Sequence, residues 1–258
     1  MMEQIKKKIG FICDMDGVIY HGNKILPGVR EFINWMIEND KRFVFLTNSS
    51  ERTPHELSMK LERMGLSVPA ENFYTSALAT AAFLDSQRPG CTAYVIGEAA
   101  LSKALYDRGI YMNDVNPDYV VVGETHSYSH EKLEKAINLV CKGAKLIGTN
   151  PDTTGPIENG IAPATGALIA PIEIATGKKA YFIGKPNPVM LRHGLKMLDC
   201  HSSEIVFIGD RMDTDIIAGI ESNVDTVLVL SGVTREEDID LFPYRPKYVV
   251  SGVGDLVK

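Results

Sequence analysis

Short apolar runs alternate with amphipathic stretches along most of the chain. The first two runs, residues 9–13 and 43–46, are apolar throughout. Between them, apolar side chains recur at helical spacing at Val29, Phe32, Ile33, Met36 and Ile37. The same alternation returns near the C-terminus, with apolar runs at residues 181–183, 205–208 and 226–230. Strands without polar alternation are covered on both faces, so the pattern predicts a parallel sheet between layers of helices.

The middle of the chain predicts a second α/β block. Its strands are expected at residues 92–96, 119–122 and 145–147, with helices that end near Gly109 and Gly143. Residues 150–166 are rich in Asn, Asp, Thr, Pro and Gly, which predicts a long ordered loop of the kind that often carries function.

The order of these elements predicts an α/β protein with two domains. A doubly wound parallel-sheet core is expected from residues 1–80 and 180–258, with an inserted α/β cap domain at residues 81–179. The composition, 45% apolar and 23% charged, is that of a globular protein, and 258 residues suffice for two hydrophobic cores.

The net charge and the cysteine content limit the classes of partner and the cellular locations that we expect. The net charge of −6 argues against a nucleic-acid partner, and no apolar run reaches the roughly 18 residues of a membrane span. Four widely spaced cysteines without a CxxC pair predict buried free thiols and a cytoplasmic location. The expected partner is a small phosphorylated metabolite, and a homo-oligomer is left open.

Two aspartates with one residue between them follow the first apolar run. Asp14 and Asp16 point the same way in an extended chain, and Gly17 permits a tight turn beyond them. Two carboxylates about 4 Å apart repel by roughly 4 kcal/mol at an effective dielectric constant of 20. The pair therefore indicates a bound cation or one carboxyl kept protonated, with an acidic surface turn as the alternative.

A polar segment and a lysine follow two further predicted strands. Thr47, Asn48 and Ser49 offer hydroxyl, amide and backbone N–H groups, which suit an oxyanion such as phosphate. Lys185 stands between a glycine and a proline, so its ammonium can be held in place. The alternatives are a polar turn before a helix and a solvated loop lysine.

A second acidic cluster follows the run at residues 205–208. Asp210 is expected to project from the strand end, whereas Asp213 and Asp215 equally fit acids in the first turn of a helix. The carboxyl ends of parallel strands share one edge of a sheet, which is where ligands bind, so these clusters are expected to meet there.

Together the clusters predict phosphoryl transfer. Asp14, Asp16 and Asp210 form an oxygen-ligand set suited to Mg²⁺. The metal and Lys185 would offset the repulsion between Asp14 and a phosphate dianion. Asp14 would then attack phosphorus and form an aspartyl-phosphate, while Asp16 transfers protons.

Three other classes of protein explain fewer of these sequence features. A phosphate-accepting receiver domain of signalling proteins uses similar residues but needs only about half this length. A DxD glycosyltransferase has no use for Thr47 and Lys185, and a binding module without activity would not need the complete catalytic set.

The ordered motifs DxDG at 14–17, Thr-Asn at 47–48, GKP at 184–186 and GDxxxTD at 209–215 resemble the haloacid dehalogenase superfamily of phosphohydrolases. The resemblance implies that Asp14 is the nucleophile, Asp16 the general acid/base and Thr47 the phosphate-binding hydroxyl. Lys185 then corresponds to the lysine of the family, Asp210 to a metal-binding carboxylate and Asp215 to a supporting acid. It also implies that Asp16 binds Mg²⁺ through its backbone carbonyl, so that the side-chain ligands are Asp14 and Asp210.

The spacing of the motifs indicates one branch of this superfamily. Thr47 lies only 31 positions after Asp16, whereas the 138 positions from Thr47 to Lys185 hold the whole middle block, as in the type-two (IIA) cap arrangement. Further stretches resemble the NagD-like nucleotide phosphatases, at residues 114–118, 122–125 and 150–152. The resemblance implies a cytoplasmic Mg²⁺-dependent phosphatase acting on nucleoside monophosphates such as UMP and on other small phosphate esters.

The loop at residues 150–166 is where we expect the cap to meet the leaving group. Asn150, Asp152 and Gly166 are candidate substrate contacts, with hydrogen bonds inside the loop as the alternative. The stretch 159–166 contains Ala-Thr-Gly where many relatives carry a Pro-Gly or Cys-Gly turn. A sugar-phosphate or phosphoglycolate phosphatase on the same scaffold is the closest competing function.

Overall fold

The computed structural model describes residues 2–157 and 160–258, and the chain forms two compact units. The core unit comprises Met1–Thr47, Leu57–Tyr74 and Lys185–Lys258. The cap unit comprises Asn48–Glu56 and Thr75–Gly184. In the described part of the chain, no helix combines the length and the apolar character needed to cross a membrane.

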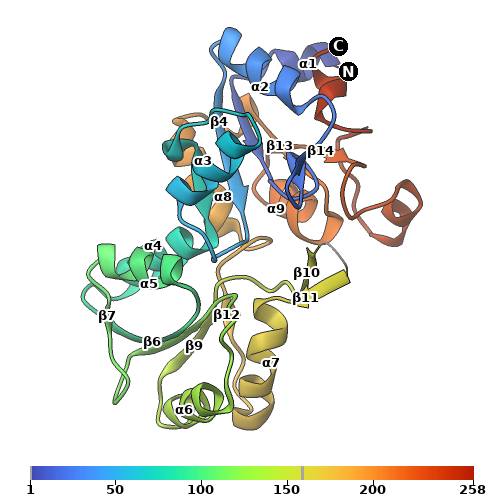
Figure 1. Ribbon diagram of the computed structural model, residues 1–258. Helices are drawn as coiled ribbons and strands as arrows, with labels where there is room; N and C mark the ends of the chain where they lie inside the picture. Colours follow the sequence, from blue (N-terminus) through green and yellow to red (C-terminus); the bar gives the residue numbers. More distant parts are fainter. Residues whose placement is uncertain (1, 158–159) are drawn as a thin grey trace. The chain divides into compact units, whose positions relative to one another are not determined.

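The core is built on a six-stranded sheet with the order β15-β14-β13-β1-β4-β5 (Figure 1). Its strands, in that order, are Tyr248–Val250, Asp225–Val229, Ile205–Gly209, Gly10–Cys13, Arg42–Thr47 and Phe73–Thr75. The pairings from β15 through β4 are parallel. β1 lies between β4 and β13, so the strand order reverses at β1, the position at which open α/β sheets bind ligands.

Helices cover both faces of the core sheet. Phe11 of β1 meets Phe32 of α2 (Val29–Glu38) edge to face, with ring centroids 6.0 Å apart. Gly194 of α8 (Pro188–Leu198) lies over Ile12, the next residue of β1, on the opposite face. The predicted doubly wound sheet is therefore confirmed. The helices of this part of the chain are α1 (Met2–Lys6), α2 (Val29–Glu38), α3 (Pro54–Arg63), α8 (Pro188–Leu198) and α9 (Ile217–Glu221).

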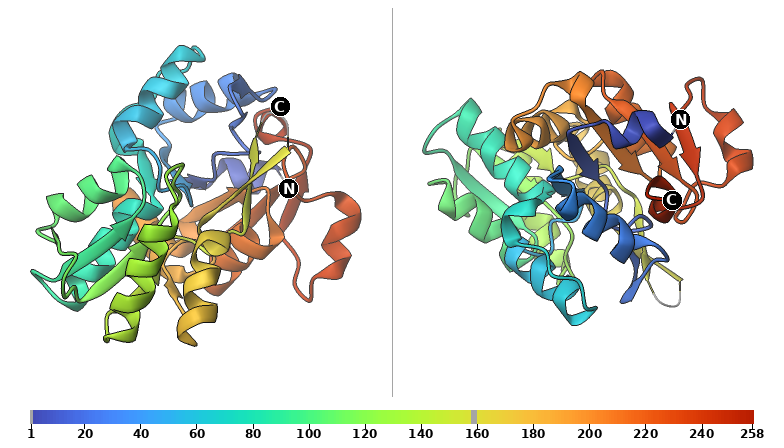
Figure 2. Two further views of the ribbon diagram at one scale, coloured as in Figure 1. Left: turned by 60° about the horizontal axis from the view of Figure 1, so that its bottom comes forward. Right: turned by 90° about the horizontal axis from the view of Figure 1, so that it is seen from above.

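The cap has its own parallel five-stranded sheet, ordered β12-β9-β8-β6-β7. Its strands, in that order, are Tyr181–Phe182, Lys145–Gly148, Tyr119–Val122, Thr92–Ile96 and Tyr111–Met112. α6 (His130–Cys141) and α7 (Thr165–Thr176) bury apolar side chains against one face. α4 (Ser76–Gln87) and α5 (Ala99–Asp107) contact each other and lie on the other face, as the ribbons of Figures 1 and 2 show. The cap helices are α4 (Ser76–Gln87), α5 (Ala99–Asp107), α6 (His130–Cys141) and α7 (Thr165–Thr176).

The strand predicted at residues 181–183 belongs to the cap and not to the core, to which the sequence pattern assigns it. It forms β12, which pairs with β9 at the edge of the cap sheet. Tyr181 is 48% exposed, as expected for an edge strand that is covered on one side only. An apolar run of three residues predicts a strand but does not say which sheet it joins.

Residues 150–166, predicted as a loop, contain an antiparallel hairpin of β10 (Thr154–Ile157) and β11 (Gly160–Pro163). The high Pro and Gly content of the segment hides the strand signal. Asn159, which belongs to the loop that the sequence analysis singled out, lies outside the described residues. A second small hairpin, in the core unit, pairs β2 (Tyr20–His21) with β3 (Lys24–Ile25).

Candidate active site

Polar residues follow the three central strands of the core sheet at their carboxyl ends. Asp14 comes directly after β1, Thr47 ends β4, and Asp210 comes directly after β13. The backbone N–H of Asp14 extends the ladder by donating to the carbonyl of Ile208 at 2.9 Å. These residues therefore share the edge at which the strand order reverses.

A buried ammonium lies among the carboxylates of this edge. Lys185 Nζ donates to Oδ1 of Asp14 and to Oδ1 of Asp215, each at 2.7 Å. It also donates to the carbonyl of Leu46, in β4, at 3.2 Å. Only 2% of Lys185 is exposed, so its charge interacts with the two carboxylates without screening by bulk water.

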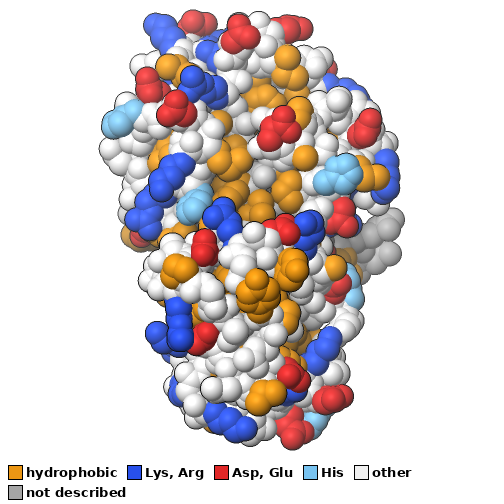
Figure 3. Space-filling model, turned by 90° about the vertical axis from the view of Figure 1, so that its left-hand side faces the viewer, with side chains coloured by type: hydrophobic (Ala, Val, Ile, Leu, Met, Phe, Trp, Pro, Cys, Tyr) orange, Lys and Arg blue, Asp and Glu red, His pale blue; other side chains and the backbone are white. Residues whose placement is uncertain are grey.

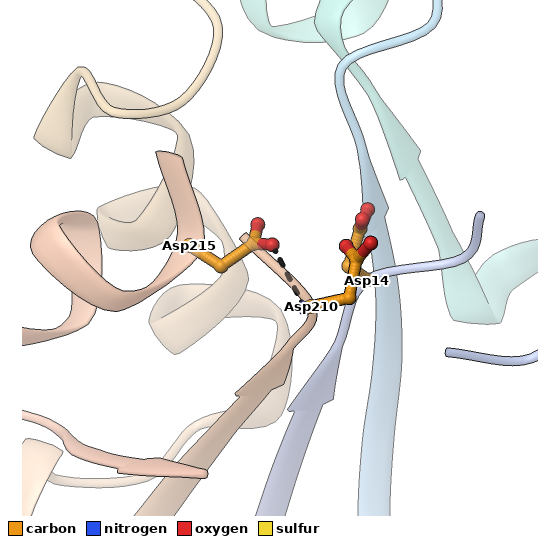
Figure 4. Close-up of side chains that lie close together, drawn as sticks. All are labelled: Asp14, Asp210 and Asp215. Atoms are coloured by element: carbon orange, nitrogen blue, oxygen red, sulfur yellow. Dashed lines mark hydrogen bonds between the residues drawn. The ribbon is translucent and has the colours of Figure 1, made fainter. Parts of the chain in front are cut away.

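Three carboxylates form one cluster, to which Asp14, Asp210 and Asp215 each contribute an oxygen within 4.8 Å of the others. Figure 4 shows the carboxylates of Asp14 and Asp210 side by side. Oδ2 of Asp215 accepts hydrogen bonds from the backbone N–H groups of Asp210 and Arg211, at 3.2 and 3.1 Å. Oδ1 of Asp210 is buried and has no hydrogen-bond partner among the described residues. A buried oxygen of this kind in an all-oxygen cluster fits a divalent cation.

Burial raises the pKa of all three carboxyls. The pKa of Asp210 rises to about 8, through burial and then through the charges of Asp215 and Asp14. The pKa of Asp215 rises to about 6, because burial outweighs the attraction of Lys185. Burial also raises the pKa of Asp14 against the same attraction. Burial by itself would lower the pKa of Lys185, but the charges of Asp14 and Asp215 raise it. The cluster therefore binds protons readily, and added positive charge would displace them.

The loop after β14 orients Asp210 and was not identified from the sequence. The backbone N–H of Val233 donates to Oδ2 of Asp210 at 2.7 Å. A Cβ atom at Gly232 would overlap the same oxygen, and so would one at Gly17, whose φ of +78° also favours glycine. The loop thus holds Oδ2 and leaves Oδ1 as the candidate ligand. A glycine after a strand is the only signal in the sequence, and it equally marks an ordinary turn.

The remaining acids of the motifs lie outside the carboxylate cluster. Asp16 is exposed, and its backbone forms an isolated bridge with Tyr20. Arg211 pairs with Asp213 through contacts of 2.9 and 3.0 Å. Asp215, which the sequence analysis treats as a supporting acid, is the third carboxylate that the structure brings together with Asp14 and Asp210.

The expected phosphate-binding segment crosses from one unit to the other. Thr47 belongs to the core, whereas Asn48 and Ser49 belong to the cap. The carbonyl of Asn48 accepts hydrogen bonds from the hydroxyl of Ser76 and from Nδ2 of Asn150, the latter at 2.8 Å. Thr47 and Asn48 are both buried, so neither is an ordinary solvated turn residue.

The cap residues proposed for substrate contact are hydrogen-bonded within the cap. Nδ2 of Asn48 donates to Oδ2 of Asp152 at 2.9 Å, and the backbone N–H of Asp152 donates to Oδ1 of Asn150 at 3.1 Å. The backbone N–H of Gly166 donates to the carbonyl of Asp152 at 2.8 Å. Glu124, for which the sequence motifs predict no role, accepts from Nδ2 of Asn150 at 2.7 Å.

Comparison with known proteins places this geometry in a family. Residues 11–111 match the haloacid dehalogenase-like hydrolases, and residues 182–256 match a HAD-hydrolase-like family. The chain belongs to the haloacid dehalogenase-like hydrolases. The division of the match into two parts leaves most of the cap between them.

Three relatives of this hydrolase align over nearly its whole length. The dihydroxyacetone phosphatase of Corynebacterium glutamicum is 47% identical over 96% of this chain and 90% of its own. The ribonucleotide monophosphatase NagD of Escherichia coli is 44% identical over 95% of this chain and 96% of its own. The acid sugar phosphatase of Staphylococcus saprophyticus is 37% identical over 98% of both chains.

The solved structure of NagD from E. coli supports the same assignment. It matches with a TM-score of 0.91, over 96% of this chain and 98% of that one. The family and the relatives agree in their chemistry, so the present hydrolase is a NagD-like phosphatase that hydrolyses phosphate monoesters.

Proposed function

We propose that this phosphatase hydrolyses small phosphate monoesters, nucleoside monophosphates in particular, through an aspartyl-phosphate on Asp14. The contact that carries the proposal is the Lys185 ammonium, 2.7 Å from both Asp14 and Asp215, beside the unpartnered buried oxygen of Asp210. This arrangement combines a nucleophile, a fixed cation and a ligand oxygen.

Mg²⁺ is the proposed cofactor. Asp14 and Asp210 would hold it through side-chain oxygens and Asp16 through its backbone carbonyl. When bound, Mg²⁺ would offset the negative charge of the phosphate group and of the nucleophile. Asp215 would support the site through its hydrogen bond from the backbone N–H of Asp210.

The side chains of this chain account for both halves of the reaction. A carboxylate oxygen of Asp14 forms a bond to phosphorus while the bond to the ester oxygen breaks, and Asp16 protonates the departing oxygen. Asp16 then takes a proton from a water molecule whose oxygen bonds to phosphorus. Phosphate leaves, and the Asp14 carboxylate is restored. Lys185 favours the ionised form of Asp14 throughout.

The phosphate oxygens would be bound by the hydroxyl of Thr47, by Asn48 and Ser49, and by Lys185. Of these, Thr47 and Lys185 belong to the core unit and the other two to the cap unit. Asn150, Asp152 and Gly166 stay candidates for contact with the leaving group, in the predicted cap loop.

The substrate class has one specific competitor. The nucleotide proposal follows the resemblance of the motifs to NagD-like nucleotide phosphatases and the 44% identity to NagD. Sugar and triose phosphates are the second candidate, because the 47% identical relative is a dihydroxyacetone phosphatase and another is an acid sugar phosphatase. Phosphoglycolate belongs to the same second class of small, non-nucleotide esters.

The proposed partner is a small metabolite in the cytoplasm. Figure 3 shows basic and acidic side chains interspersed over the face drawn, unlike the clustered basic surface of a nucleic-acid binder. The four cysteines are free thiols, which supports a reducing compartment. Cys13 and Cys91 are buried, as predicted, whereas Cys141 is exposed and Cys200 is partly exposed. Self-association, which the sequence leaves open, would be measured by light scattering.

The test is phosphate release from UMP, dihydroxyacetone phosphate, glucose 6-phosphate and phosphoglycolate, with and without Mg²⁺. We expect Mg²⁺-dependent hydrolysis with the highest kcat/KM for UMP, and a loss of at least about 10³-fold in Asp14→Asn with the fold retained. A highest kcat/KM for one of the other esters would establish the second class. Substantial activity in Asp14→Asn would refute the aspartyl-phosphate mechanism.

A further inference from the structure

A hydrogen-bond network in the cap surrounds the segment that directly follows Thr47. We propose that Glu124 is a positioning residue, whose carboxylate fixes the backbone of Asn48–Ser50 and so sets the geometry of the phosphate-binding segment. This inference rests on the proposed function, because Asn48 and Ser49 are assigned to phosphate there.

Glu124 holds Ser50 through both its backbone and its side chain. The backbone N–H of Ser50 donates to Oε2 of Glu124 at 2.9 Å, and the Ser50 hydroxyl donates to the same oxygen. The backbone N–H of Glu124 lies 3.2 Å from Oγ of Ser50 and donates to it. A Cβ atom at Gly123 would lie 2.6 Å from Oγ of Ser50, so a glycine is needed for this close approach.

The second oxygen of Glu124 extends the network to Asn48. Oε1 accepts from Nδ2 of Asn150 at 2.7 Å, and the same amide donates to the carbonyl of Asn48 at 2.8 Å. The Asn48 side chain is held in turn by Oδ2 of Asp152 at 2.9 Å. Both ends of the segment Asn48–Ser50 are thus fastened to residues that follow the carboxyl ends of β8 and β9.

The chemistry of the network requires an acceptor with two open oxygens. All the groups that face the Glu124 carboxylate are donors: the backbone N–H and hydroxyl of Ser50, and the amide of Asn150. A glutamine would turn an NH₂ group toward at least one of these donors and leave it unsatisfied. The glutamine side chain therefore has nearly the volume of glutamate, but one of its two terminal groups donates a hydrogen bond where the carboxylate accepts one.

The position of the segment in the chain links this network to catalysis. Thr47 is the last core residue before the cap segment Asn48–Glu56, so residues 48–50 are covalently continuous with the end of β4. A displacement of about 1 Å at a group that binds the reacting phosphate costs up to about 10²-fold in rate. Glu124 needs no contact with the substrate to have such an effect.

Glu98 provides a matched control on the same edge of the cap sheet. It stands two residues beyond β6, as Glu124 stands two residues beyond β8. Its Oε1 accepts from the hydroxyl of Thr125 and the backbone N–H of His126, each at 2.9 Å. Neither partner belongs to Asn48–Ser50, and the amide oxygen of a glutamine can accept both hydrogen bonds. Glu98→Gln therefore removes a carboxylate charge from the same edge of the cap sheet and leaves the contacts of the segment in place.

The experiment compares Glu124→Gln with Glu98→Gln by calorimetric titration with inorganic phosphate and by kinetics with UMP and p-nitrophenyl phosphate. We expect Glu124→Gln to weaken phosphate binding by about tenfold or more, and to lower kcat/KM for both esters by the same factor, between about 10- and 100-fold. Glu98→Gln should stay within about twofold of the wild type.

Unchanged phosphate affinity in Glu124→Gln overturns the proposal, and so do unequal losses for the two esters, which would indicate contact with the leaving group. If that variant does not fold, Ser50→Ala removes the hydroxyl of Ser50, which donates to Oε2 of Glu124 and accepts from the backbone N–H of Glu124, and it keeps the backbone N–H of Ser50 on Oε2. It should weaken phosphate binding in the same direction, and no change there overturns the proposal as well. A crystal structure of Glu124→Gln with residues 48–50 in their original conformation would also overturn the proposal. This structural test does not depend on activity, because a wild-type protein that hydrolyses no ester would refute only the proposed function.

Discussion

Lys185 and Asp215 form a buried ion pair at 2.7 Å, in which 2% and 1% of the two side chains are exposed. The same ammonium contacts Asp14 at 2.7 Å, so Asp215 anchors the cation that offsets the charge of the proposed nucleophile. The supporting acid therefore acts on Asp14 through Lys185 and on Asp210 through a backbone N–H.

Removal of the ammonium should destabilise the core. Lys185→Met leaves Asp14 and Asp215 buried without their cation, so we expect the free energy of unfolding to fall by about 3–5 kcal/mol in urea titrations. Lys145→Met is the control, because Lys145 is exposed and has no ion-pair partner among the described residues. Its effect should stay within about 0.5 kcal/mol. Equal effects of the two substitutions would contradict the assigned role of the buried cation.

Asp16→Asn should separate proton transfer from binding. The amide can neither donate nor accept the transferred proton, so we expect kcat for UMP to fall by about 10²- to 10⁴-fold. The loss should be smaller with p-nitrophenyl phosphate, whose leaving group departs without protonation. Phosphate affinity should hardly change, because Asp16 lies outside the carboxylate cluster. Loss of Mg²⁺ binding would instead mean that the side chain has a structural role.

Stability of the metal-free protein should fall as the pH rises. Asp210 has a pKa of about 8 in the folded protein against a usual 3.8, so between these values the folded state binds more protons than the unfolded state. The free energy of unfolding therefore decreases from about pH 4 to pH 8, and Asp215, with a pKa of about 6, adds to the lower part of this range.

Mg²⁺ should weaken this dependence of stability on pH, because it displaces the protons from the carboxylates. We expect its binding at pH 7 to release protons, measured as a dependence of the calorimetric heat on the ionisation enthalpy of the buffer. The slope of stability against pH should shrink in saturating Mg²⁺. A binding heat that is the same in all buffers would show that the carboxylates are already ionised.

Gly232→Ala should weaken metal binding selectively. The added Cβ overlaps Oδ2 of Asp210 and displaces the carboxylate, so the Kd for Mg²⁺ should rise by at least about tenfold. Gly252→Ala is the control, because its backbone is extended and the nearest atom to the added Cβ is 4.0 Å away. Calorimetric titration with Mg²⁺ distinguishes them, and wild-type affinity in Gly232→Ala would rule out this role of the loop.

The fold class and the order of the clusters along the chain follow from the amino-acid sequence. Runs of apolar residues without alternation specify covered parallel strands, and this local pattern suffices because each strand and helix buries its own apolar face. The motifs that follow those strands carried the family resemblance, since the spacing between them is preserved in the linear chain. The sequence therefore predicts that Asp14, Thr47 and Asp210 lie at one edge of the sheet.

Which of these side chains meet, and which groups orient them, depends on how the chain folds in three dimensions. Asp215 joins the carboxylate cluster through a contact with Lys185, thirty residues away in sequence, and Glu124 meets Ser50 across seventy-four. The same is true of β12, which joins the cap sheet rather than the core. Such pairings depend on long-range packing and on the need of each buried donor and acceptor for a hydrogen-bond partner. The local periodicity of the sequence contains no information on these partners.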